Sequence, residues 1–201
     1  MFALIGKSRN RCGLRSQSAG FTLIELMMVV AIVGILSVLA VYGGRKYVAN
    51  AKSAEARNAV GQMAKDAVTA FERDSINQNL VGVGKGSNVA RNLCASASAS
   101  VPASISSVTG HKYQSKAAEW SADSAANAGF YCLKFSMEEP QYYMYSYSVT
   151  GSNNVGDSFT ASAQGDTNAD GVTSLFQIVG QIDSARRLLT SPQILEVRPD
   201  E

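Results

Sequence analysis

The stretch GFTLIELMMVV, Gly20 to Val30, places a glutamate, Glu25, near the start of an apolar run. The run continues to Tyr42, so Phe21–Tyr42 holds 22 residues with a single charge. As an α-helix this segment would rise about 33 Å, enough to cross the hydrocarbon core of a bilayer. An ionised side chain at the centre of such a helix costs about 2.5 to 3.5 kcal/mol and usually marks a function. The stretch therefore predicts a membrane helix and singles out Glu25.

A basic segment precedes the apolar run. Residues 1–20 contain four of the 18 Lys and Arg residues and no acid. A secretory signal peptide is the alternative, but the apolar run is longer than the usual h-region, contains an acid and is followed by no A-x-A site. Without this segment, 14 basic residues face 16 acidic ones. The remainder shows no basic excess of the kind that marks a nucleic-acid-binding protein.

The three cysteines divide in the same way. Cys12 lies in the basic segment, and Cys94 and Cys132 lie in the remainder. An even pair in an exported chain predicts a disulfide; the alternative is two unrelated buried thiols. No Cys/His spacing suggests zinc, and the single histidine, His111, has no partner motif. An enzyme is disfavoured, because no nucleophile, base and orienting group can be assembled from these residues.

Helical periodicity continues beyond the apolar run. Small and apolar residues recur at steps of three and four, at Ala49, Ser53, Ala56, Val60, Ala64, Ala67 and Phe71, and charged residues occupy the other faces. We therefore predict one long helix, roughly Phe21 to Asp74. Its first half, 21–42, would be soluble in lipid, and its second half, 43–74, would be amphipathic.

Residues 75–129 are rich in Gly, Ala and Ser and indicate loops. The segment VGVGKGSN, 81–88, fits neither phosphate-binding pattern: Gly86 stands where GxxxxGK[ST] needs Ser or Thr, and Ser87 stands where GxGxxG needs glycine. For the tract ASASASVPASISS, 95–107, we favour a plain solvated loop over an O-glycosylated one.

The final region, 130–201, indicates strands at Phe130–Met137, Gln141–Thr150, Ser158–Gln164 and Ser174–Ile182, followed by a tail. In the second strand, alternation places Tyr143, Tyr145 and Tyr147 on one face. Short connections suit antiparallel pairing. The predicted fold class is α+β, in which the amphipathic half of the helix covers a four-stranded antiparallel sheet.

The segment DTNADG, Asp166 to Gly171, fits the first half of a calcium-loop pattern, in which Asp166, Asn168 and Asp170 would converge on a cation. The twelfth position, where a glutamate is expected, holds Gln177 inside a predicted strand. We favour a plain hairpin turn over calcium at this site, and expect no other cofactor.

A basic leader that ends in glycine, then Phe-Thr-Leu-Ile-Glu-Leu and a long apolar helix, resembles the type IV pilin and pseudopilin family over Gly20 to about Leu39. The sheet that follows adds a resemblance of architecture. The resemblance implies that a prepilin peptidase cuts between Gly20 and Phe21 and methylates the new amine on Phe21. It also implies that Glu25 acts in assembly and that the helix loosens at Gly34 in the fibre. The alternative for Glu25 is a helix cap near the membrane interface that needs no partner.

The function implied is that of a structural subunit of a type IV pilus serving adhesion, motility or DNA uptake. The alternative is a pseudopilin of a type II secretion system. The implied partners are other pilin subunits in a helical fibre, the prepilin peptidase, the inner-membrane assembly machinery and, before assembly, the membrane itself. The chain would be a single-pass inner-membrane protein first. It would then be extracellular on the cell surface, or periplasmic if it is a pseudopilin.

Overall fold

The computed structural model describes residues 20–73 and 91–199. The rest of the predicted leader, Cys12 included, and the glycine-rich segment 81–88 lie outside the described residues. The chain divides into two compact units, one ending at Gly43 and the other beginning at Gly44. Each unit is described by itself below.

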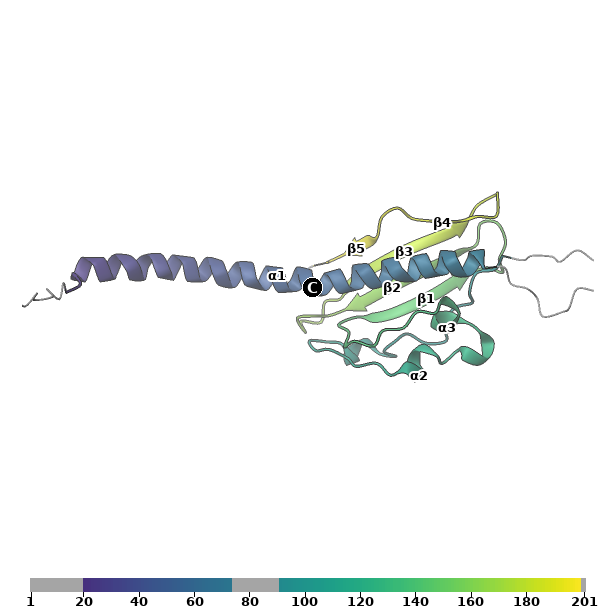
Figure 1. Cartoon of the computed structure of the whole chain (residues 1–201), viewed down its shortest axis with the longest axis horizontal. Coiled ribbons are helices and arrows are strands. Elements are labelled where there is room, and N and C mark those ends of the chain that lie inside the picture. The colour runs from purple at the N-terminus through teal and green to yellow at the C-terminus, as the bar shows by residue number, and fades with distance from the viewer. Residues whose placement is uncertain (1–19, 74–90, 200–201) are drawn as a thin grey trace, which may run out of the picture. The chain divides into compact units, whose positions relative to one another are not determined.

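Helix α1 runs from Leu23 to Glu72, close to the predicted Phe21–Asp74. It begins after Thr22, whose carbonyl oxygen accepts the first helical hydrogen bond, from Leu26 N at 3.2 Å. The part of α1 in the second unit buries the predicted small-residue stripe, at Ser53, Ala56, Val60, Ala64, Ala67 and Phe71, and adds Ala59 and Met63 to it. This face packs against the sheet (Figure 1).

The sheet has five antiparallel strands in place of the predicted four. Strands β1 (Met144–Thr150), β2 (Ser158–Gly165) and β3 (Ser174–Ile182) pair in sequence order. The short strands β4 (Leu188–Thr190) and β5 (Leu195–Val197) both pair with the remaining edge of β3. The predicted fold class, α+β with a long helix on an antiparallel sheet, is confirmed.

One face of the sheet forms the core beneath α1. Tyr143, Tyr145 and Tyr147 are buried, as the alternation predicted. In register with the last two lie Ala163 and Ala161 of the neighbouring strand β2, both fully buried. The alanines of β2, the tyrosines of β1 and the buried face of α1 belong to one hydrophobic core.

The Ala/Ser tract lies outside the strands and is mostly exposed, as expected of the loop that we predicted, but its backbone also pairs with the sheet. Residues 97–101 follow the outer edge of β1: Ala97 N donates to Tyr147 O at 3.0 Å, and Val101 and Tyr145 exchange two backbone hydrogen bonds. The side chains of this tract are mostly exposed, in keeping with its Ala/Ser composition. Its backbone nevertheless satisfies the edge of the sheet, which would otherwise be open.

The predicted strand Phe130–Met137 is wrong. Its first part forms helix α3 (Gly129–Leu133). The helix is followed by Lys134, whose backbone is in the left-handed region with φ 62°. The helical turn buries Phe130 and Leu133, three residues apart, and Phe135 is buried after the chain reverses. Trp120, the last residue of helix α2 (Ala117–Trp120), packs edge-on against Phe130 and Phe135. Two 3₁₀ turns, η1 (Ile105–Ser107) and η2 (Ser124–Ala126), complete this region.

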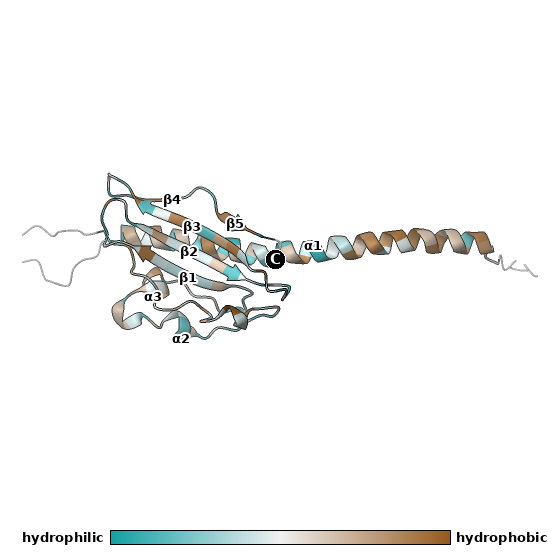
Figure 2. Cartoon of the chain, turned by 180° about the vertical axis from the view of Figure 1, so that it is seen from behind, coloured by the Kyte–Doolittle hydropathy of each residue, from teal (hydrophilic) through white to brown (hydrophobic). Residues whose placement is uncertain are grey.

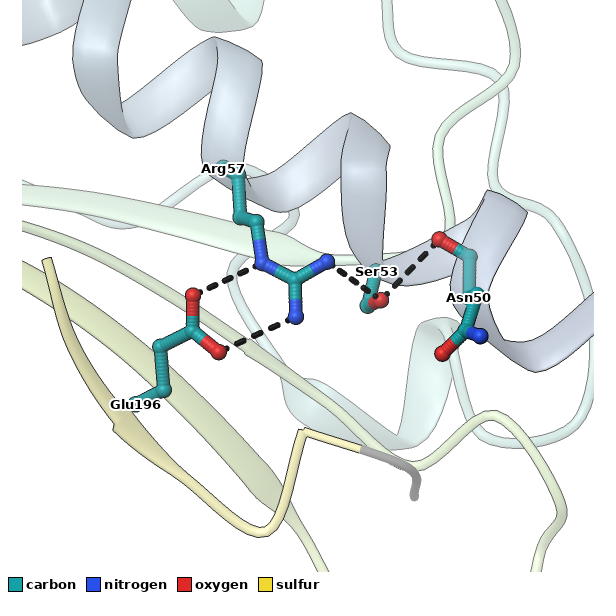
Figure 3. Close-up of polar contacts among 4 residues, drawn as sticks. All are labelled: Asn50, Ser53, Arg57 and Glu196. Atoms are coloured by element: carbon teal, nitrogen blue, oxygen red, sulfur yellow. Dashed lines mark hydrogen bonds and ion pairs between the residues drawn. The ribbon is translucent and has the colours of Figure 1, made fainter. Parts of the chain in front are cut away.

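Strand β5 is tied to α1 by an ion pair. The Arg57 guanidinium donates to both carboxylate oxygens of Glu196, at 2.7 and 3.0 Å, and also to Ser53 Oγ (Figure 3). Glu196 faces the helix because its partner in the β3 register is the buried Phe176, over whose ring Arg57 lies. Strand β5 has only three residues, all exposed. It is held by the bidentate Arg57–Glu196 contact and by its backbone pairing with β3.

Candidate processing and assembly site

The start of α1 is an exposed, capped helix terminus. Gly20 and Phe21 precede the helix, and 78% of the Phe21 surface is exposed. Thr22 Oγ1 accepts a hydrogen bond from Glu25 N at 3.3 Å and donates one to Glu25 Oε2 at 3.4 Å. Glu25 thus lies in the first turn, where the helix dipole favours a carboxylate. The Gly20–Phe21 peptide bond lies just outside the helix.

Sequence reasoning missed the role of Thr22. The spacing Thr22-x-x-Glu25 is the S/T-x-x-E signature of a helix N-terminus, so the signal was present. The cap explains part of what Glu25 does within one chain. In the uncut chain the Phe21 nitrogen is an amide without charge, so any pairing between it and Glu25 requires cleavage first.

The first half of α1 has no covering within its own chain. Every residue from Gly20 to Gly43 is exposed, including aliphatic side chains such as Leu26, Ile32 and Leu36. In Figure 2 the ribbon of this part of the helix is mostly brown, the colour of hydrophobic residues. By length and composition α1 can cross a membrane. Exposed apolar area on this scale indicates a lipid or protein partner.

Gly34 lies inside this apolar half. A Cβ built on it would meet no atom within 4 Å, so no contact within the chain requires glycine there. Glycine in a helix interior costs about 1 kcal/mol relative to alanine. The structure of the single chain thus leaves room for a side chain at Gly34. Nearby, Ser37 Oγ donates to Val33 O at 2.7 Å, which satisfies this hydroxyl in an apolar setting.

The predicted disulfide is formed. Cys94 and Cys132 are joined, with 5.8 Å between their Cα atoms. Cys132 belongs to α3, and not to the strand that we predicted over Phe130–Met137. The disulfide therefore joins this helix to the segment that leads into the edge of β1. Gly129 N also donates to Ala95 O at 2.9 Å, so the covalent link and the hydrogen bond dock α3 on the same segment.

The Asp166–Gly171 segment forms the turn between β2 and β3. The buried Asp166 carboxylate accepts from Ala169 N at 2.7 Å and Gly171 N at 3.1 Å. Asp170 accepts from Val172 N, and Asn168 Oδ1 accepts from Asp170 N. The described residues contain no cluster of three or more His, Cys, Asp or Glu side chains arranged for a metal. The oxygens predicted as cation ligands thus accept hydrogen bonds within their own turn.

Comparison with known proteins gives the N-terminal segment a family. Residues 15–41 match the prokaryotic N-terminal methylation motif. Fimbrial protein EcpC of Eikenella corrodens is 44% identical over 61 residues, and the type IV major fimbrial protein FimA of Dichelobacter nodosus is 44% identical over 50. Over part of its length the chain is thus similar to type IV fimbrial proteins, and residues 15–41 carry the methylation motif.

The likeness of the chain to these relatives is confined to part of each protein. The match with EcpC covers 30% of this chain and 39% of its relative, and the match with FimA covers 25% and 32%. No solved structure gives a significant match. The chain therefore spans less than half the length of the relatives it matches.

Proposed function

We propose that this chain is a type IV pilin, a structural subunit of a type IV pilus. Prepilin peptidase cuts between Gly20 and Phe21 and methylates the Phe21 amine. The subunit then waits in the inner membrane, with Phe21–Tyr42 in the bilayer, until the assembly machinery incorporates it into an extracellular fibre. The observation that carries the proposal is the apolar first half of α1, whose side chains are all exposed in the single chain.

The same surface serves two environments in this scheme. In the membrane its aliphatic side chains lie among lipid tails, and in the fibre they lie among the equivalent helices of other subunits. Transfer between two apolar surroundings costs little hydrophobic free energy, because lipid tails are as apolar as leucine. Polar contacts must therefore decide the axial position of one helix against the next.

Glu25 and the new Phe21 amine supply such a contact. Cleavage creates a positive charge at the edge of the apolar helix, four residues before a carboxylate. In a bundle of apolar helices an unpaired amine and an unpaired carboxylate are both costly, and a pair between neighbouring subunits offsets both costs. The pairing is satisfied at one axial offset only, so it sets the register between subunits.

Substitution of Glu25 tests this role. We expect Glu25→Ala to leave cleavage after Gly20 intact and to reduce sheared extracellular fibre by more than about tenfold, since an uncompensated buried charge costs about 3 to 5 kcal/mol. The matched control is Glu72→Ala, which removes an exposed carboxylate from the other end of α1. Cleavage is scored by mass and fibre by shearing. Normal fibre yield in Glu25→Ala would contradict the pairing.

A further inference from the structure

A small groove lies in the second unit, directly after the predicted membrane segment. Its volume is about 360 Å³, and it is lined by Gly44, Arg45, Val48, Ala49, Lys52, Thr167 and Asn168. One wall is α1, and the other is the turn between β2 and β3, at the end of the sheet where β2 ends (Figure 1). We propose that this groove binds the phosphate of a membrane phospholipid while the subunit is stored in the bilayer.

The position of the groove in the chain favours a headgroup as the ligand. Arg45 follows Tyr42, the last residue of the predicted membrane segment, by three residues. Three residues span at most about 11 Å even when fully extended, and about 4.5 Å as a helix. The headgroup region on each side of the hydrocarbon core is about 5 to 7 Å thick. The inference thus rests on the proposed membrane stage of this pilin.

The charges of the groove suit a phosphate. Arg45 and Lys52 are its two ionised lining residues. Lys52 is held in place, because its ammonium donates to Thr167 O at 3.1 Å and lies 4.9 Å from the centre of the Tyr142 ring. An ammonium has three donors and that hydrogen bond uses one of them. A guanidinium presents a planar set of donors that matches phosphate oxygens.

The acidic side chains of the turn do not oppose this arrangement directly. Asp166 is buried and accepts from two backbone N–H groups of its own turn. Asp170 accepts from Val172 N and from the Asn168 amide. N–H groups of the turn thus donate hydrogen bonds to both carboxylates. The cationic side chains of α1 line the groove. Helical side chains also lean toward the helix N-terminus, the end of α1 that holds the predicted membrane segment.

The test uses the full-length protein in cell membranes, with a photo-crosslinking amino acid at Val48, which lines the groove and is 52% exposed. We expect a crosslink to phosphatidylglycerol. A hydrogen bond to a charged group contributes about 1.5 to 3 kcal/mol, so Arg45→Gln should lower the crosslink at least about tenfold. The matched control, Lys46→Gln, removes a cation one residue away that does not line the groove, and should retain most of it.

Equal losses in Arg45→Gln and Lys46→Gln would overturn the site, because they would indicate general attraction to an anionic surface. Competition by inorganic phosphate would overturn the lipid assignment in favour of free phosphate. Formation of the Cys94–Cys132 disulfide on a non-reducing gel verifies folding of each variant. A chain in the membrane fraction that gives no crosslink refutes this inference alone, whereas a chain absent from that fraction refutes the proposed function as well.

Discussion

Glu55 shows how one carboxylate connects the helix to the sheet. It accepts from Tyr142 N at 2.8 Å and from the Tyr145 hydroxyl at 3.1 Å. Burial raises the pKa of this carboxyl, and the two hydrogen bonds and Lys112 offset part of the rise. Its folded pKa lies above its unfolded value, so the folded state holds the extra proton. Stability is therefore lost as the pH rises from about 4.3 through the folded pKa.

We predict that Glu55→Gln removes this loss, because an amide oxygen can accept the same two hydrogen bonds without carrying charge. The melting temperature of Glu55→Gln minus that of the native chain, both in detergent, should increase as the pH rises from about 4 to 7. The control is the exposed Glu139→Gln. A difference between Glu55→Gln and the native chain that stays constant with pH would show that Glu55 does not titrate in this way.

Single residues differ in how far the sequence alone reveals them. Glu25 stands out because it is the only charge in a membrane-length run, and the buried tyrosines follow from a two-residue period. Glu55 looks like one more charge on a helix surface. Its partner Tyr142 lies 87 residues away, so no local pattern can reveal the contact.

Strand β5 is the element that depends most on a single side-chain contact. Hydrogen bonding to Arg57 lowers the pKa of Glu196, so this ion pair stabilises the strand above the unfolded pKa of glutamate and is lost as the pH falls through the folded value. We predict that Glu196→Gln speeds amide hydrogen exchange in Leu195–Val197 by a few-fold, since a partly exposed pair contributes about 0.5 to 1 kcal/mol.

The comparison for β5 is Asp183→Asn, which removes the other ion pair described, between Asp183 and Arg187. That change should leave exchange in β5 as it is in the native chain. If Glu196→Gln also leaves β5 protected at neutral pH, the three-residue ladder with β3 holds the strand by itself.

The disulfide secures the region that covers the edge of β1. Its cysteines are 38 residues apart, and closing a loop of that length stabilises the folded state by about 4 kcal/mol in the chain-entropy account. We predict that Cys94→Ser with Cys132→Ser lowers the melting temperature strongly and increases proteolysis of residues 95–101. Cys12→Ser, the same chemical change in the leader, should alter neither. Unchanged melting of the double variant would contradict this account.

The turn between β2 and β3 should fold without a metal. Its carboxylates already accept backbone hydrogen bonds, as at Asp166. We predict the same melting temperature with millimolar calcium and with chelator. A ligand at about 100 times its Kd would add about 2.7 kcal/mol, which would be visible as an upward shift. Such a shift, abolished by Asp170→Asn, would establish a calcium site.

Elements with a long, regular pattern could be predicted from the sequence, and the others could not. The α1 stripe and strands β1 to β3 extend over enough residues to display a period. Strands β4 and β5 have three residues each, too few for a period, and exist through pairing with β3. At α3, apolar residues between 130 and 135 fit a strand as well as a helical turn, and the disulfide and packing on Trp120 select the turn.

At the scale of the molecule, the two units differ in what they bury. The described apolar residues of the first unit are exposed, whereas the second unit contains a buried hydrophobic core. The second unit satisfies both edges of β1–β3, through residues 97–101 on one side and β4 and β5 on the other. The first half of α1 buries none of its residues. This contrast was visible in the sequence, because composition changes at Gly43–Gly44 from aliphatic to charged and small.

The most direct test of the central claim is the N-terminal mass of the chain in fibres sheared from cells. We predict abundant chain that begins at N-methyl-Phe21, with residues 1–20 removed. Chain that still carries the leader in intact fibres would contradict processing as a condition of assembly. Absence of the chain from surface fibres, with the methylated form retained in the cell envelope, would contradict a major pilus subunit and indicate a pseudopilin.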